Sequence, residues 1–190
     1  MRRTRRLLVA LTAIGVAAVG AGTVEAEPLD REHYSGTDSD SFDDCGFTID
    51  VEATFSGLFM LKEGRRGDPT PYVFDNYRYV NVFTNPATGA SFTQSGNGLF
   101  KNLHIVNVEG TVYRFESIEV GRPFEIRDMA GNLVIKDRGH LRTRFSLDTQ
   151  GDTDLENDVF IEGTFELVAD NGAHPGFFID FCDIANDLIG

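Results

Sequence analysis

The sequence predicts an all-β domain, and three observations support this fold class. Residues 47–55 alternate strictly between apolar and polar side chains, which is the period of a strand with one buried face. Similar short apolar stretches recur along the chain and are separated by turn residues, such as Asn-Pro-Ala-Thr-Gly at 85–89. No stretch keeps the roughly 3.6-residue period of a helix. The pattern therefore predicts an antiparallel meander of roughly eight to ten short strands.

The first strand is expected to start at Cys45 and to bend at Ser56-Gly57, where the alternation breaks and a bulge fits. A loop is predicted over residues 63–71. Turns are predicted at 96–98 and, as a hairpin, at Glu109-Gly110. The other strands are predicted at residues 77–84, 90–95, 99–108, 111–120, 124–127, 133–136, 141–147, 159–167 and 177–181, with one helical turn at 183–188.

Residues 1–26 have the three parts of a secretory signal peptide. The arginines of residues 2–6 form a positive start, residues 7–22 are apolar and uncharged, and Val24-Glu25-Ala26 offers a cleavage site. The apolar run is short for a membrane span of about 20 residues. The arginines fit both a general secretory signal and a twin-arginine signal. The sequence therefore predicts a secreted, extracellular protein with no transmembrane segment after cleavage.

Two parts remain after cleavage. Residues 27–44 are rich in Asp and Ser and have no period, which predicts a flexible acidic arm. Residues 45–190 are expected to form a single all-β domain.

The formal net charge of the whole chain is −13, and removal of the arginine-rich signal makes it more negative. A field of this sign repels nucleic acid and anionic lipid. We therefore expect neither as a partner, and we expect a monomer.

Cys45 and Cys182 lie at the two ends of the predicted domain and are its two cysteines. In an oxidising compartment such a pair predicts one disulfide. The bridge would bring the first and last strands together, as the closing of a sheet into a barrel requires, although a β-sandwich also permits it. We expect a closed up-and-down barrel, comparable in fold to the calycin and allene-oxide-cyclase barrels, with a sandwich as the alternative.

Several short motifs follow one another in a recognisable order. They are Cys-Gly-Phe at 45–47, Thr-Asn-Pro-Ala-Thr-Gly at 84–89, Asp-Arg-Gly at 137–139, Asp-Thr-Gln-Gly-Asp at 148–152 and Phe-Cys-Asp at 181–183. In this order the chain resembles a family of small secreted actinobacterial proteins, over most of residues 45–183. The resemblance implies an exported β-rich domain of uncharacterised function and assigns no catalytic residue.

Tyr77, Tyr79, Asn81 and His104 are the predicted lining of a pocket inside the barrel. An aromatic lining with few polar groups suits a small apolar ligand. His104 alternates with apolar neighbours, so a role as a core residue is the alternative. Arg142 and Arg144 are expected on the opposite face of their strand, where they would balance cross-strand acids such as Glu162 and Glu166.

One predicted loop is crowded with carboxylates: Asp148, Asp152, Asp154, Glu156 and Asp158. Ca²⁺ takes about six to eight oxygen ligands, so these side chains are candidates for a calcium site. The loop departs from an EF-hand, because Asn157 stands at the glycine position and Gly163 at the position of the bidentate glutamate. A solvated acidic loop is the alternative.

The sequence contains no nucleophile elbow, phosphate-binding loop or zinc-binding spacing. It therefore favours a non-enzymatic secreted barrel that binds a small apolar ligand or a surface partner, with no cofactor except the candidate Ca²⁺. A small barrel enzyme of the cyclase or hydrolase type, which needs an inward carboxylate or histidine, is one alternative. A calcium-stabilised structural module is the other.

Overall fold

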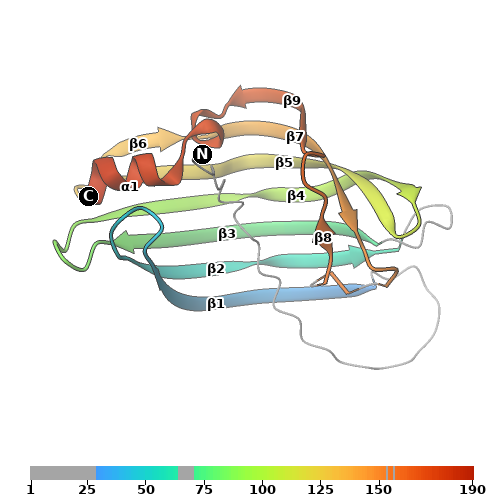
Figure 1. Ribbon diagram of the computed structural model, residues 1–190, viewed down its shortest axis with the longest axis horizontal. Coiled ribbons are helices and arrows are strands. Elements are labelled where there is room, and N and C mark those ends of the chain that lie inside the picture. Colours follow the sequence, from blue (N-terminus) through green and yellow to red (C-terminus); the bar gives the residue numbers. More distant parts are fainter. Residues whose placement is uncertain (1–28, 64–70, 153, 156) are drawn as a thin grey trace.

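A computed structural model describes residues 29–63, 71–152, 154–155 and 157–190. They form an all-β fold with one short helix (Figure 1). The strands are β1 (Asp30–Phe42), β2 (Ile49–Lys62), β3 (Tyr72–Thr84), β4 (Ser91–Glu109), β5 (Val112–Arg127), β6 (Leu133–Lys136), β7 (Arg138–Asp148), β8 (Val159–Phe160) and β9 (Glu166–Ala173). A 3₁₀ turn, η2 (Pro175–Phe178), and helix α1 (Phe181–Ile189) follow.

Some predicted features fall on parts of the chain that the structure does not describe. The predicted signal peptide is one of these, and so is most of the loop predicted at residues 63–71. Within the described ranges, no helix is both long enough and apolar enough to cross a membrane.

The strands form one antiparallel sheet of nine strands, and this confirms the predicted all-β meander. Its main path is β1-β2-β3-β4-β5-β7-β8, with β6 paired to β5 and β9 paired to β7. Among the described strands, no ladder joins β1 to β8 or β9. The sheet is therefore open at the place where a barrel would close.

Strand β1 corrects the prediction of a flexible arm over residues 27–44. Residues 30–42 pair with β2 along their whole length, from Asp30 opposite Leu61 to Phe42 opposite Ile49. The segment lacks a clear apolar period because most of its side chains are exposed. Its order comes instead from the backbone ladder and from a few inward contacts, such as the ring contact of Tyr34 with Phe55.

Several further predictions are wrong. The strand predicted at 159–167 is not continuous, because β8 covers only Val159–Phe160 and β9 begins at Glu166. Residues 96–98 are not a turn, because β4 continues through them. Residues 177–181 are not a strand: η2 and the start of α1 occupy them. Pro175 begins η2, and the Asp180 side chain caps α1 by accepting a hydrogen bond from the Cys182 backbone N–H at 2.8 Å. The local start signals of a helix thus prevail over the short apolar alternation.

The sheet has two faces, which we call inward and outward. The inward face is the one on which α1 packs. There Ile49, Phe83, Phe92 and Ile126, from four neighbouring strands, form a core with Ile184 and other α1 residues. Figure 1 shows α1 over one end of this face, with β8 crossing nearer the other end. The outward face is opposite to it.

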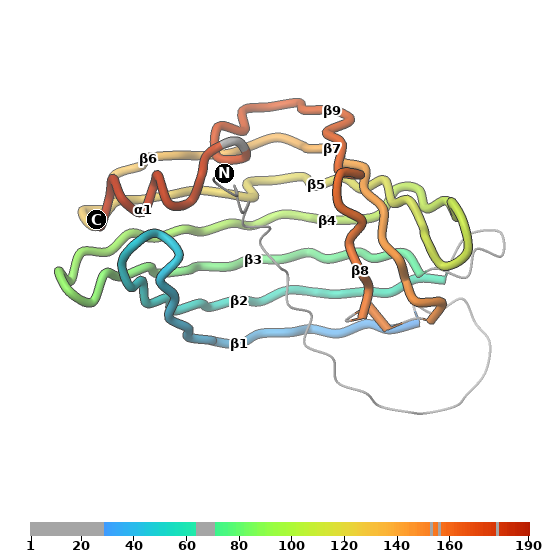
Figure 2. The backbone as a smooth tube through the Cα atoms, viewed as in Figure 1, coloured from blue at the N-terminus to red at the C-terminus, as the bar shows by residue number. Residues whose placement is uncertain are grey.

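Four glycines lie side by side across the sheet where it bends. Gly98, Gly121, Gly139 and Gly172 are successive partners on β4, β5, β7 and β9. Gly121 and Gly139 have φ values of 134° and 123°, which side chains with a Cβ rarely adopt. A glycine at such a kink lets a sheet curve. Figure 2 shows the far half of β7 bending over the inward side, so the outward face is the convex one.

The predicted disulfide between Cys45 and Cys182 is confirmed. It joins the segment before β2 to the first turn of α1, with 137 residues of separation and a Cα–Cα distance of 5.0 Å. In the chain-entropy account, closing a loop of this length stabilises the fold by about 5 kcal/mol. The bridge therefore holds α1 on the inward face.

Candidate functional site

The four residues of the predicted pocket do not share one face. Tyr77, Tyr79 and Asn81 are alternate residues of β3 and lie on the inward side. His104 is exposed, and its register partner is Glu116 on the outward face. The structure therefore brings three of the four together and separates His104 from them.

The two tyrosines are engaged in packing and hydrogen bonding. Tyr77 donates its hydroxyl hydrogen to Glu119, and Tyr79 donates to the carbonyl oxygen of Pro123 at 2.8 Å. A Cβ at Gly96 would lie 2.4 Å from the Tyr79 ring, so that ring already fills the space above the glycine. Burial raises the pKa of Tyr79 to about 12. Both hydroxyls are thus neutral donors inside the fold at physiological pH.

Buried acids also lie on this side of the sheet. Asp75 accepts a hydrogen bond from the Tyr34 hydroxyl at 2.9 Å, and Asp137, between β6 and β7, accepts one from the Gly176 backbone at 2.8 Å. Burial raises the pKa of the Asp75, Glu119 and Asp137 carboxyls above their ordinary values. His174 is 5 % exposed, and its Nε2 lies 3.5 Å from Asp170 Oδ1.

The candidate calcium ligands are only partly described, because Glu156 lies outside the described residues. Asp148 accepts hydrogen bonds from the Thr111 hydroxyl and the Gln150 backbone, while Asp152 accepts from the Asp154 backbone and the Asn157 amide. Among the described residues, no three potential ligands converge on one point. The calcium site stays a prediction.

The lysines and arginines of the sheet lie on one of its two faces, whereas the acids lie on both. Register places every lysine and arginine that the structure describes on the outward face. They are Arg31, Lys62, Arg78, Lys101, Arg114, Arg122, Arg127, Lys136, Arg138, Arg142 and Arg144. Among the described residues, the inward face carries acids without lysine or arginine, including Glu32, Asp75, Glu119 and Asp170. The outward face also carries acids, such as Glu52, Glu116 and Glu125, but its described cations outnumber them. An acidic protein thus presents one basic face.

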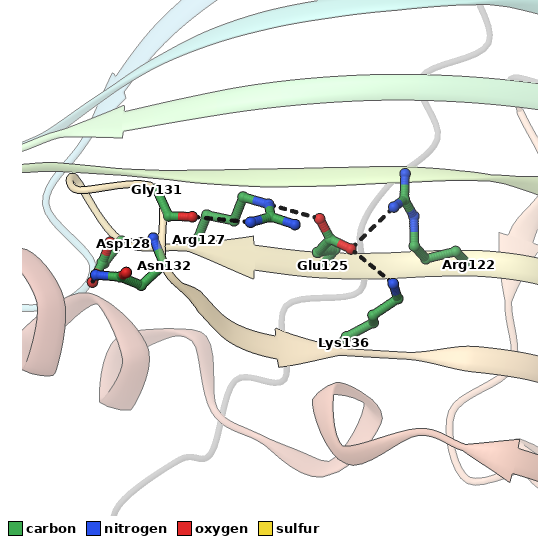
Figure 3. A network of polar contacts seen from close by, with 7 residues as sticks. All are labelled: Arg122, Glu125, Arg127, Asp128, Gly131, Asn132 and Lys136. Carbon is green, nitrogen blue, oxygen red and sulfur yellow. Dashed lines mark hydrogen bonds and ion pairs between the residues drawn. The ribbon is translucent and has the colours of Figure 1, made fainter.

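Three cations of this face meet one carboxylate (Figure 3). Arg122 Nη1 and Lys136 Nζ lie 3.0 and 3.5 Å from Glu125 Oε2, and Arg127 Nε lies 2.9 Å from Oε1. The Glu125 side chain is 4 % exposed, whereas its three partners are 39–45 % exposed. Burial alone would raise the Glu125 pKa, but the Arg127 hydrogen bond and the three positive charges lower it. We call these four residues the Glu125 cluster.

A second ion-pair network lies farther along β5. Glu116 pairs with Arg142 and Arg144, and Arg144 also pairs with Glu166 at 2.9 Å. The expected pairing of Arg144 with Glu166 is thus confirmed. Two cations face two carboxylates here, so this network is balanced. The Glu125 cluster is not, because it sets three cations against one acid.

Two grooves open on the outward face. His104, Val106, Arg114, Glu116 and Arg144 line the smaller groove, with a volume of about 310 Å³. The larger groove is about 550 Å³. It has the polar lining residues His33, Ser35, Ser56, Asn76 and Arg78, together with Leu58, Phe74 and the two tyrosines Tyr34 and Tyr77. Each groove combines arginine and histidine with other hydrogen-bonding groups. This is a surface that can bind oxyanions.

Apart from Arg142 and Arg144, the outward cations were not among the candidate residues that the sequence predicted. Their common face depends on strand register, and β4 and β5 shift register between Ser95 and Asn97 and between Asn102 and His104. A one-residue shift moves a side chain to the other face. The sequence does contain one signal for this common face: basic residues that alternate along a single strand, such as Arg142 and Arg144, lie on the same side of it.

We compared the chain with known protein families, curated proteins and solved structures. No family model, no curated protein and no solved structure matches the chain.

Proposed function

We propose that the protein is exported and acts without catalysis, by binding an anionic glycan chain along its outward face. One observation carries the proposal: every described lysine and arginine lies on that face, although the chain has a net charge of −13. Export is supported by the predicted signal peptide and by the disulfide, which persists in oxidising compartments.

Charge separation of this kind favours a partner that contacts one face only. The rest of the molecule is acidic, so its long-range field repels a densely charged polymer. At contact distance the local cations dominate, because salt screens charges beyond about 8 Å. A glycan with one carboxylate per sugar carries fewer charges per unit length than a nucleic acid duplex, and it satisfies both conditions when it follows the basic face. Nucleic acid, with its dense phosphates, does not, and we expect no binding to it.

The larger groove favours a glycan over a membrane. Its serine hydroxyls, Asn76 amide and Arg78 guanidinium can exchange hydrogen bonds with sugar hydroxyls and acidic groups. The outward face lies on the convex side of the bend at β7 (Figure 2), and a flexible chain can follow this bend better than a flat bilayer can.

A matched pair of variants tests the proposal. Arg78→Gln and Asn81→Asp both change the net charge by one negative unit, and both lie on β3, but on opposite faces. We expect Arg78→Gln to weaken binding of polygalacturonate several-fold in calorimetric titration, and Asn81→Asp to leave it nearly unchanged. Binding of the parent should fall steeply with added salt.

Three comparison probes complete this experiment: neutral dextran, double-stranded DNA and phosphatidylglycerol vesicles. Equal loss in both variants would show that only net charge matters, and loss in Asn81→Asp alone would place binding on the inward face. Either result, or tighter binding to DNA or vesicles than to the polyuronate, would overturn the proposal.

A further inference from the structure

We propose that the Glu125 cluster is the subsite that receives one oxyanion group of the bound chain, a carboxylate or a phosphate or sulfate ester. The inference rests on the proposed function and names the residues that recognise the charged group. In this account Glu125 is a positioning residue, and Arg122, Arg127 and Lys136 contact the anion.

Unbalanced charge is the first argument. Arg122, Arg127 and Lys136 each pair with the same carboxylate, so the cluster keeps two positive charges in excess. Like charges held this close repel one another. A bound oxyanion would relieve that repulsion. The Glu116 network would gain nothing comparable, since Glu166 already supplies its second negative charge.

Unused hydrogen-bond donors are the second argument. A guanidinium has five N–H donors in a fixed fork. Arg127 uses Nε on Glu125 and Nη1 on the Gly131 carbonyl, which leaves Nη2 without an assigned acceptor. Arg122 uses Nη1 on Glu125, and its Nε is buried without a hydrogen-bond partner among the described residues.

Fixed geometry is the third argument. The buried Glu125 carboxylate holds one cation from β6 and two from β5 on a single rigid pair of strands (Figure 3). Arg127 is fixed a second time by the turn that joins these strands, through Gly131. Donors that are already ordered lose little conformational freedom on binding, which favours recognition of a particular group.

The decisive variant is Glu125→Gln, because charge and positioning predict opposite results for it. Removal of a negative charge makes the outward face more basic, so electrostatics alone predicts tighter binding of polygalacturonate. Loss of the positioning carboxylate predicts weaker binding, by about tenfold if one bidentate contact is lost. Glu52→Gln is the matched control, since it removes the same charge from an exposed glutamate on the outward face that lines neither groove.

We expect Glu125→Gln to weaken binding and Glu52→Gln to leave it unchanged or make it tighter. Arg127→Lys, which keeps the charge but loses the fork, should also weaken binding. If Glu125→Gln does not fold, binding by Arg127→Lys tests the subsite in its place. Thermal unfolding of each variant shows whether it is folded. Binding as tight as the parent's in both Glu125→Gln and Arg127→Lys would overturn the subsite. If Arg78→Gln still weakened binding, the proposed function would stand; if it did not, both would fail.

Discussion

Single carboxyl groups in this protein differ in what surrounds them. Glu125 is buried among cations, so its pKa is lowered, whereas the acids of the inward face are buried without lysine or arginine beside them. Asp158 is a third case. Burial, and then the negative charges of Asp152, Asp154 and Asp148, raise its pKa to about 6. The surroundings of each acid therefore determine how pH acts on it.

Asp158 gives a prediction for the pH dependence of stability. Its folded pKa lies above its ordinary value of 3.8, so the folded state disfavours the charged form. The stability that this group contributes is present below about pH 4 and is lost as the pH rises through about 6. We expect Asp158→Asn to melt at a higher temperature than the parent at pH 7.5.

The same comparison at about pH 2.5, well below the ordinary pKa of 3.8, is the control, because Asp158 is then almost fully protonated in both folded and unfolded chains. There the melting temperatures of parent and variant should nearly coincide. A difference of the same size at both pH values would contradict the assignment. Thermal unfolding followed by circular dichroism measures both.

At the scale of elements, β1 is held to the sheet by close contacts between rings and glycines. Gly36 on β1 is the register partner of Phe55 on β2. A Cβ at Gly36 would lie 2.8 Å from the end of the Phe55 ring, which is shorter than real contacts allow. The ring therefore lies on the glycine, as aromatic residues do when they cover a cross-strand glycine.

A double-mutant cycle tests this contact. Gly36→Ala should lower the free energy of unfolding by about 1–3 kcal/mol, the usual range for overpacking. In a Phe55→Ala background the same substitution should cost much less, because the ring is gone. Urea unfolding of the four proteins gives the coupling energy. A Gly36→Ala substitution without effect in the parent would show that β1 is not paired as described.

The elements that could be predicted were those with a local signal. Strict alternation located β2, and the turn residues around Gly131 correctly separated β5 from β6. The bend of β4 through Gly96 and Gly98 was taken for a turn. The reason is that those glycines serve a cross-strand contact with the rings of Tyr79 and Tyr77, which local sequence does not reveal.

The site was harder to predict than the fold. The disulfide could be predicted because the chain has two cysteines and a predicted signal for export to an oxidising compartment. The pairing of Arg144 with Glu166 could be predicted from the alternation of side chains along the strands. The Glu125 cluster did not, because Arg122 and Glu125 share a face only through the irregular register of β5 against β4. Local spacing alone would place those two side chains on opposite faces.

At the scale of the whole molecule, the central feature is the separation of charge between a convex basic face and a concave acidic one. The net charge of −13 gives the total of all charges and does not show how they are distributed between the two faces. The sheet stays open and bends at its row of glycines, so the two faces have different shapes as well as different charges. A partner that fits one face should therefore leave the other untouched.

Nuclear magnetic resonance of side-chain signals tests that claim most directly. During titration with oligogalacturonate, we expect the Nε–Hε signals of outward arginines, Arg78, Arg122 and Arg127 above all, to shift in a saturable way. The ring signals of Tyr79 and Phe83, on the inward face and outside both grooves, should stay in place. Shifts confined to these rings, with unchanged arginine signals, would contradict the assignment of the binding face.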